Sequence, residues 1–152
     1  MRSVRLRRTS DADADLLTAW LSSPDVYRGW GGAPVPRETV VAKYTGRRAP
    51  DVECFLVLVE DTPVAFVQEV DDGEERAIDM FVAPGQQRRG FGGATVEAVA
   101  AEARRVGKCL LSVDPRPSNE GGVAFWRALG FQDDGPPTPA DAIRMVLRLT
   151  AE

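Results

Sequence analysis

One stretch, residues 78–93 with the sequence IDMFVAPGQQRRGFGG, constrains the fold of this chain more than any other. Its apolar start predicts a short strand over Ile78–Val82, which ends before Pro84 because proline has no N–H to donate to a sheet. The loop that follows contains the glycines Gly90, Gly92 and Gly93. Glycines let a backbone approach a ligand closely, and the first turn of the helix predicted next offers N–H groups and the positive end of a dipole. Strand, loop and helix therefore predict a cradle for an anion such as pyrophosphate.

The residues of this loop resemble the signature of the GNAT acyltransferase superfamily. Gln87, Gly90 and Gly92 match its pattern Q/R-x-x-G-x-G/A, which grips the pyrophosphate of acetyl-coenzyme A. The resemblance implies acetyl-CoA as co-substrate, with no metal. It implies cofactor contacts by Phe81, Val82, Gln87, Arg88, Arg89, Gly90, Phe91, Gly92, Gly93, Asn119, Phe125 and Trp126.

Later segments agree with this resemblance in their order. A strand predicted over Cys109–Val113 is followed by the run Asp114–Asn119, in which Asn119 resembles the family's asparagine that hydrogen-bonds the pantetheine arm. The segment Ala124–Phe131, AFWRALGF, resembles the closing F-Y-x-x-x-G-F helix and strand. The resemblance implies the α/β (α+β) GNAT fold, a mixed, mostly antiparallel twisted sheet of about seven strands flanked by helices. We expect one domain over residues 1–152.

The charge and composition of the chain restrict its chemistry. The chain has no histidine, which effectively excludes zinc sites and Ser-His-Asp triads. Its net charge is −4, so Arg88 and Arg89 supply the local positive charge that a polyanionic coenzyme needs, while the acids elsewhere suit a cationic small-molecule amine. Nucleic acid is not expected as a partner.

The cysteines and apolar runs indicate a compartment. We expect Cys54 and Cys109, both within apolar runs, to be buried reduced thiols. No apolar run approaches the roughly 18 residues that span a bilayer, and the basic N-terminus lacks the apolar segment of a signal peptide. These features predict a cytoplasmic protein without a membrane partner, as a monomer or homodimer.

Local patterns predict the remaining elements. Ser10 caps a helix that ends at Pro24. Two apolar runs, Cys54–Val59 and Val64–Val70, predict a β-hairpin, and a second, acidic turn follows over Val70–Arg76. The helix after the glycine loop is expected to bury Val96, Val99, Ala100, Ala103 and Val106.

Asp79 is the first catalytic candidate. On the predicted strand it shares a face with Phe81, and a carboxylate there is costly unless it is paired. It is either a structural partner for another group or the base that orients the acceptor ammonium and takes its proton. The ordinary pKa values of about 3.9 and about 10.4 leave a gap of roughly 6.5 units, or about 9 kcal/mol. Either burial raises the pKa of the carboxyl, or the acceptor amine has a lowered pKa, as amino sugars do. A backbone N–H near Phe81 or Val82 is a candidate for stabilising the oxyanion.

Three further residues have both a structural and a functional interpretation. Trp30 lies in a glycine-rich aromatic loop, which is either a turn with ring anchors or one wall of the acceptor site. Asp114 is either a turn residue before Pro115 or a second contact to a cationic acceptor, because ligands bind at the carboxyl ends of such strands. Asp141, just before the last strand, is a possible third contact.

The pattern is most similar to one branch, the aminoglycoside 6′-N-acetyltransferases, which confer antibiotic resistance. The matching segments are Trp30–Gly32, Ile78–Asp79, Asp114–Asn119, and Thr138–Pro139 with Asp141. The resemblance implies that Asp79 and Asp114 contact the drug amines as catalytic residues, with Asp79 as base. It implies an acceptor site formed by Trp30, Asp72, Glu75, Asp79, Asp114 and Asp141.

Two departures from that branch stand out. The segment Asp71–Arg76 keeps acids but is short and lacks the family's aromatic flap. Trp126 replaces the tyrosine that often protonates the leaving thiolate, and an indole N–H is a far weaker acid. We therefore expect water or the acceptor's own proton to protonate the thiolate.

Two other functions remain open from the sequence. One is a GNAT acyltransferase for another amine, such as a siderophore hydroxylysine, a polyamine or a protein N-terminus; the hydroxylysine branch usually carries a histidine, which this chain lacks. The other is a non-catalytic acyl-CoA-binding module. Asp79 is the residue that distinguishes the two, because an enzyme needs it as a base and a binding module does not.

Overall fold

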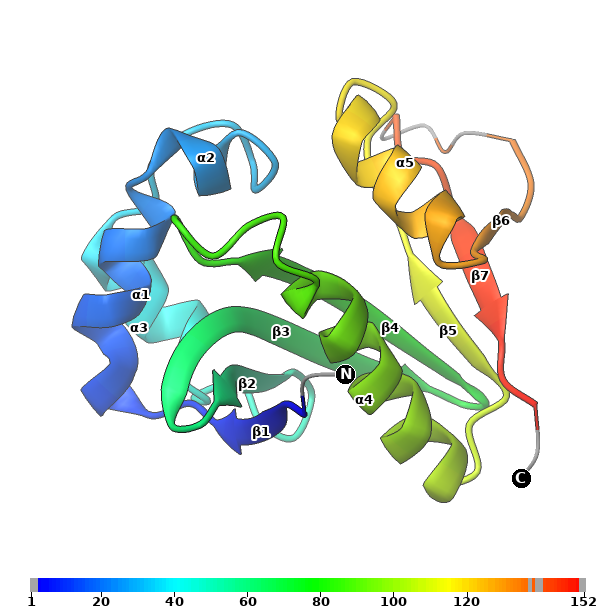
Figure 1. Cartoon of the computed structure of the whole chain (residues 1–152), viewed down its shortest axis with the longest axis horizontal. Coiled ribbons are helices and arrows are strands. Elements are labelled where there is room, and N and C mark those ends of the chain that lie inside the picture. Colours follow the sequence, from blue (N-terminus) through cyan, green and yellow to red (C-terminus); the bar gives the residue numbers. More distant parts are fainter. Residues whose placement is uncertain (1–2, 137, 139–140, 151–152) are drawn as a thin grey trace. The chain divides into compact units, whose positions relative to one another are not determined.

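The computed structural model describes residues 3–136, 138 and 141–150 (Figure 1). Its helices and strands follow one another in the order β1 (Arg5–Arg8), the 3₁₀ helix η1 (Asp11–Asp13), α1 (Ala14–Leu21), α2 (Pro24–Tyr27), α3 (Arg37–Tyr44), β2 (Glu53–Val59), β3 (Thr62–Asp72), β4 (Glu75–Val82), α4 (Phe91–Arg105), β5 (Leu110–Val113), α5 (Glu120–Ala128), β6 (Gln132–Asp133) and β7 (Met145–Arg148). No helix in the described part of the chain is both long enough and apolar enough to span a membrane.

The strands form one seven-stranded sheet in the order β1-β2-β3-β4-β5-β7-β6. The pairs β1–β2, β2–β3, β5–β7 and β6–β7 are antiparallel, and β4 pairs with β5 in parallel. This arrangement confirms the predicted mixed, mostly antiparallel sheet. The chain divides into two compact units, residues 1–70 with 79–98 (unit 1) and residues 71–78 with 99–152 (unit 2).

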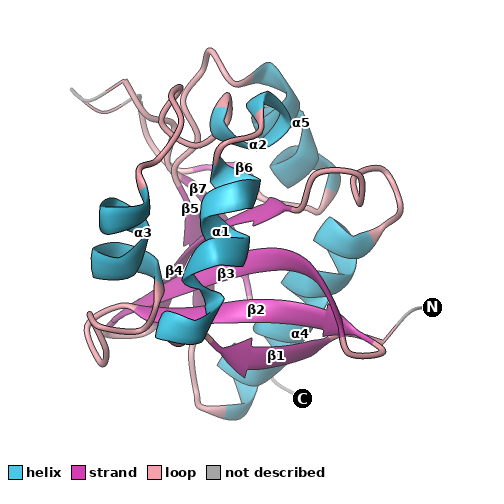
Figure 2. Ribbon diagram, turned by 90° about the vertical axis from the view of Figure 1, so that its left-hand side faces the viewer, coloured by secondary structure: helices cyan, strands magenta, loops and turns pink. Residues whose placement is uncertain are grey.

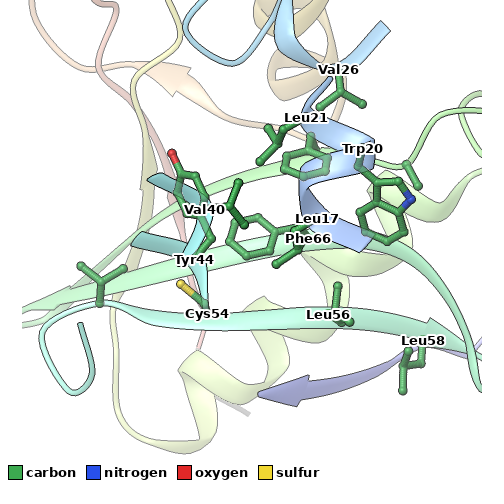
Figure 3. Close-up of a cluster of buried hydrophobic side chains, with 13 residues drawn as sticks. Leu17, Trp20, Leu21, Val26, Val40, Tyr44, Cys54, Leu56, Leu58 and Phe66 are labelled. Atoms are coloured by element: carbon green, nitrogen blue, oxygen red, sulfur yellow. The ribbon is translucent and has the colours of Figure 1, made fainter. Parts of the chain in front are cut away.

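The core of unit 1 lies between α1, α3 and the strands β2 and β3. Figures 1 and 2 show α1 and α3 side by side, and the close-up in Figure 3 shows their apolar side chains meeting Leu56 and Phe66 from the strands. The α1 helix buries Leu17, Trp20 and Leu21, as its apolar periodicity predicts. Pro24 does not simply end this helix: α1 stops at Leu21, and Pro24 occupies the first position of α2, where proline is favoured.

Both predicted turns are shorter than the sequence indicates. The β2–β3 hairpin turns on Glu60 and Asp61, which have positive φ angles of 49° and 68°, as a tight two-residue turn requires. The predicted acidic turn over Val70–Arg76 is wrong in extent. The strand β3 continues to Asp72 and β4 begins at Glu75, so its outer acids belong to strands rather than to a loop.

Two predictions about burial in unit 2 are wrong. Cys109 precedes β5 and is exposed, whereas Cys54 in unit 1 is buried as expected; both thiols are free. Val106 is 47% exposed, while Val99, Ala100 and Ala103 are buried. The reason is that α4 ends at Arg105, and Gly107, with a φ of +87°, turns the chain away so that Lys108 N–H donates to the Ala103 carbonyl at 2.9 Å.

Candidate functional site

The loop between β4 and α4 has the form of an anion cradle. After β4, Ala83 N–H donates to the Val64 carbonyl (2.8 Å) and holds the start of the loop on β3. Gly90 has a φ of +83°, a conformation that favours glycine, and no atom lies within 4 Å of the position that a Cβ would take. The N–H of Ala94 donates to the Gly90 carbonyl at 3.1 Å, so the N–H groups before it form the first turn of α4. This open, glycine-lined helix start fits a pyrophosphate.

The side chains of this loop add positive charge and anchor it. Arg88 and Arg89 are exposed, and Arg88 has a positive φ of 62°. Arg89 donates to Gln86 Oε1 at 2.7 Å, and its guanidinium lies 5.1 Å from the centre of the Phe91 ring. Phe91 itself is buried. The two arginines therefore lie on the loop where a diphosphate would need cations.

Gln87 connects the loop to α2. Its Nε2 donates to the Asp25 carbonyl at 3.2 Å and to the Val82 carbonyl at 3.4 Å. One amide thus links the end of β4 with the first turn of the helix that leads into the Trp30 loop. The signature glutamine has an anchoring role in this fold beside its predicted role in cofactor binding.

Asp79 is exposed on β4, in unit 1. Its Oδ1 accepts a hydrogen bond from Met80 N–H at 3.0 Å, which orients the carboxylate. Two residues further along the strand, Phe81 is buried and stacks on Phe66 with ring centres 5.4 Å apart. Asp79 thus lies on the strand that anchors an aromatic cluster. The cradle loop begins four residues after Asp79, where β4 ends.

The aromatic cluster consists of Trp30, Tyr44, Phe66 and Phe81. Trp30 is half-buried and meets the other three rings edge-on, at centre distances of 5.8, 5.9 and 5.2 Å. Its Nε1 donates to the Tyr44 hydroxyl at 3.0 Å. Burial raises the pKa of Tyr44 above its ordinary value, and the nearby negative charge of Asp79 raises it further. Trp30 and Asp79 are therefore brought into the same part of unit 1.

Unit 2 holds the predicted residues of the later segments. Asp114 directly follows β5 and stays exposed, yet partial desolvation raises the pKa of its carboxyl. Asn119 caps α5, since its Oδ1 accepts from Gly122 N–H at 3.1 Å. Trp126 is buried and packs edge-on against Phe125 and Phe131, at 4.8 and 5.1 Å between ring centres.

The other acids predicted at the acceptor site have different surroundings. Both carboxylate oxygens of Glu75 accept from Arg144, at 2.6 and 2.8 Å, and one also accepts from Ser112 Oγ at 2.6 Å. Arg144 and Ser112 lower the pKa of Glu75 to about 2. Asp72 is exposed at the end of β3, and Asp141 is exposed with a positive φ of 57°. Pro139, part of the predicted pattern, lies outside the described residues.

Two contributors were missed in the sequence. Tyr44 reads as one apolar position on the stripe of its helix, and nothing in that pattern indicates that its hydroxyl meets Trp30. Arg144 lies 69 residues from Glu75, and its alternation with buried Met145 in β7 is the one sequence signal for a charged group on the other face.

Comparisons with known proteins test the family resemblance. The sequence model of the Acetyltransferase (GNAT) family matches residues 16–131, which include parts of both units. No curated protein sequence matches the chain. The solved structure of AAC(6')-Ib in complex with paromomycin and acetyl-CoA is 25% identical, with a TM-score of 0.84 over 96% of this chain and 93% of that one.

Two more distant structures share the fold alone. An acetyltransferase from Thermus thermophilus is 24% identical, with a TM-score of 0.84 over 98% of this chain and all (100%) of its own. The spermidine N-acetyltransferase from Vibrio cholerae, in complex with CoA and spermine, is 14% identical, with a TM-score of 0.81 over 97% of this chain and 96% of that one.

Proposed function

This chain belongs to the acetyltransferase (GNAT) family, and from that premise we propose that it moves the acetyl group of acetyl-CoA to a primary amine of a cationic small molecule, the 6′-amine of an aminoglycoside. Membership in this family confirms the expected fold and acetyl-CoA as co-substrate. The transfer is direct, within a ternary complex, and Asp79 is the base. One observation carries this proposal: an exposed, oriented carboxylate stands on the strand that leads into the anion cradle.

The donor side is served by the loop and the start of α4. Backbone N–H groups of the first turn, with the glycines at 90, 92 and 93, receive the pyrophosphate, and Arg88 and Arg89 balance its charge. When bound, acetyl-CoA supplies the activated acetyl group. Asn119, Phe125 and Trp126 in unit 2 are the proposed partners of the pantetheine arm.

On the acceptor side, Asp79 attracts the ammonium and removes one proton. The gap of about 9 kcal/mol between an ordinary aspartate and an alkyl ammonium makes this step costly for a simple amine. An amino-sugar amine with a lowered pKa narrows the gap, which favours an aminoglycoside as acceptor. The likeness to AAC(6')-Ib, whose structure contains paromomycin and acetyl-CoA, supports the same choice.

The remaining acids hold the other charges of a polycation. Asp114, Asp72 and Asp141 are exposed and therefore accessible to ammonium groups. Partial desolvation raises the pKa of Asp114, and an ammonium bound beside this carboxylate would lower that pKa again. Glu75 is proposed as a more remote contributor, because Arg144 already balances its charge. Resistance to aminoglycosides is the cellular role that this substrate implies.

The test is thiol release from acetyl-CoA against a panel of amines. The panel contains kanamycin, tobramycin, gentamicin forms with and without a free 6′-amine, spermidine, hydroxylysine and a peptide. We expect high kcat/KM only for drugs with a free 6′-amine. Turnover of spermidine or peptide without drug turnover would refute the aminoglycoside assignment and retain the acetyltransferase activity.

The role of Asp79 is tested separately. We expect Asp79→Asn to lower kcat/KM by about a hundredfold or more, as removal of a general base does. Asp61→Asn is the matched control, because the side chain of Asp61 is 90% exposed in a turn. Its backbone is left-handed, a conformation that asparagine tolerates. Equal rates in the two variants would remove Asp79 as base.

A further inference from the structure

Tyr44 is a buried residue whose pKa is affected by the charge of Asp79, the proposed base. Tyr44 is the last residue of α3, and its ring packs against Trp30 and Phe66 at 5.8 and 5.5 Å. Figure 3 shows the ring beside Val40, with its hydroxyl at the end away from Cys54. The side chain is therefore fixed by packing on several sides.

This hydroxyl has hydrogen-bonding capacity in reserve. A phenol donates one hydrogen bond and accepts two. Trp30 Nε1 donates to it at 3.0 Å, and among the residues that the structure describes Trp30 is its hydrogen-bond partner. One acceptor site and the O–H remain for a ligand or water. This remaining capacity allows the hydroxyl to bind a polar group of a ligand without losing its bond to Trp30.

The charge next to Tyr44 defines which group fits there. Asp79 lies close enough for its charge to add to the effect of burial on the Tyr44 pKa, so the phenol stays neutral at physiological pH. A neutral oxygen beside a carboxylate suits a cation with several N–H groups. An anion does not fit there, because the Asp79 carboxylate would repel it.

We propose that Tyr44 is a specificity-determining residue of the acceptor site: its hydroxyl, held by Trp30 Nε1, accepts a hydrogen bond from the primary ammonium that Asp79 deprotonates. This inference rests on the proposed function. The ammonium gives one proton to Asp79, and the freed lone pair forms the N–C bond while the thioester C–S bond breaks and the thiolate leaves. The second proton that the nitrogen must lose passes to the thiolate, directly or through water. Tyr44 keeps its proton throughout and fixes the direction of the lone pair.

The kinetic test compares hydroxyl removal at two places. Tyr44→Phe keeps the ring contacts, and we expect it to raise KM for the amine at least tenfold while KM for acetyl-CoA stays within twofold. Trp30→Phe should raise KM for the amine less than Tyr44→Phe does. The double variant should have the same KM for the amine as Tyr44→Phe, because both changes act on one hydroxyl. Thr18→Val is the control: its hydroxyl bonds to the Ala14 carbonyl within α1, at 2.7 Å. Amine KM values for Tyr44→Phe equal to those of this control would overturn the inference.

A second measurement does not depend on turnover. The chain has three tryptophans, so its indole N–H signals are few and can be assigned by nitrogen-edited NMR of single Trp→Phe variants. We expect the Trp30 signal to shift on titration with the amine in the wild type, and to lose that shift in Tyr44→Phe. If no amine in the panel is acetylated, the proposed function fails, and this titration alone decides: a shift supports the inference, and an unmoved signal overturns it.

Discussion

Replacing Glu75 by glutamine distinguishes a framework role for this acid from a role in acceptor binding. Glutamine keeps the size of the side chain but removes the charge that Arg144 and Ser112 surround in unit 2. Arg144 retains Asp134 as a partner, since its Nε donates to that carboxylate at 2.9 Å. The variant therefore weakens one ion pair without leaving the guanidinium unpaired.

The structure gives the size of the effect. The pKa of Glu75 falls from 4.5 to about 2 in the fold, and at about 1.36 kcal/mol per pKa unit this gap corresponds to about 3.4 kcal/mol of stability at neutral pH. Because the side chain of Arg144 is 36% exposed, solvent screens part of this energy, and we expect a loss of about 2 kcal/mol.

The sign of the pH dependence follows from the lowered pKa. The charged form of Glu75 stabilises the fold fully above pH 4.5, the ordinary pKa of the carboxyl, and this stabilisation disappears as the pH falls through about 2. The free energies of unfolding of wild type and Glu75→Gln should therefore differ most at pH 7, and the difference should fall to about half by pH 3. Urea denaturation followed by tryptophan fluorescence measures both values, with Asp61→Asn as the exposed control.

The same variant also tests function. With a framework role, KM for the amine should change less than twofold. A tenfold rise in that KM with unchanged stability would refute the reasoning and place Glu75 among the direct acceptor contacts.

Four further substitutions, one of them a control, test the cofactor side. Gly122→Ala should lower stability by about 1 kcal/mol and raise KM for acetyl-CoA, because a Cβ there would lie 2.5 Å from Asn119 Nδ2 and displace the cap; unchanged thermal unfolding would contradict this. Gly90→Ala should cost about 1–2 kcal/mol from its positive φ and also raise KM for acetyl-CoA. Gly135→Ala is the control: with a φ of +95° and equally open space, it should cost the same stability with no effect on KM for acetyl-CoA. Equal KM values for acetyl-CoA in the Gly90 and Gly135 variants would contradict a role of Gly90 in binding the cofactor. Trp126→Tyr should change kcat less than tenfold, whereas a larger rise in single-turnover rate would show that thiolate protonation limits the reaction.

The features that sequence alone predicted well are local. The glycine loop, the Ser10–Asp13 capping box and the β2–β3 hairpin each depend on residues within a few positions, and the structure contains all three. The sheet followed from the order of these elements and from the family resemblance. Short-range rules are sufficient there because the backbone chemistry of a turn or cap is decided by the residues in it.

What the sequence could not give depends on contacts between distant segments. Glu75 stands in an acidic run that suggests a cation site, and only the fold brings Arg144 to it, from 69 residues away. Trp30 suggests an exposed stacking surface, yet three other rings cover much of it. Cys109 lies in an apolar run but falls one residue outside its strand. In each case tertiary packing decided the environment, which periodicity does not encode.

The unequal exposure of the two cysteines has a practical consequence for chemical labelling. Cys54 is buried and desolvation raises its pKa to about 11, so at neutral pH it is almost entirely a protonated, inaccessible thiol. Cys109 is free and exposed. A disulfide reagent that counts released coenzyme A should therefore also react once with each protein molecule, and a maleimide dye should attach at this single position without mutagenesis.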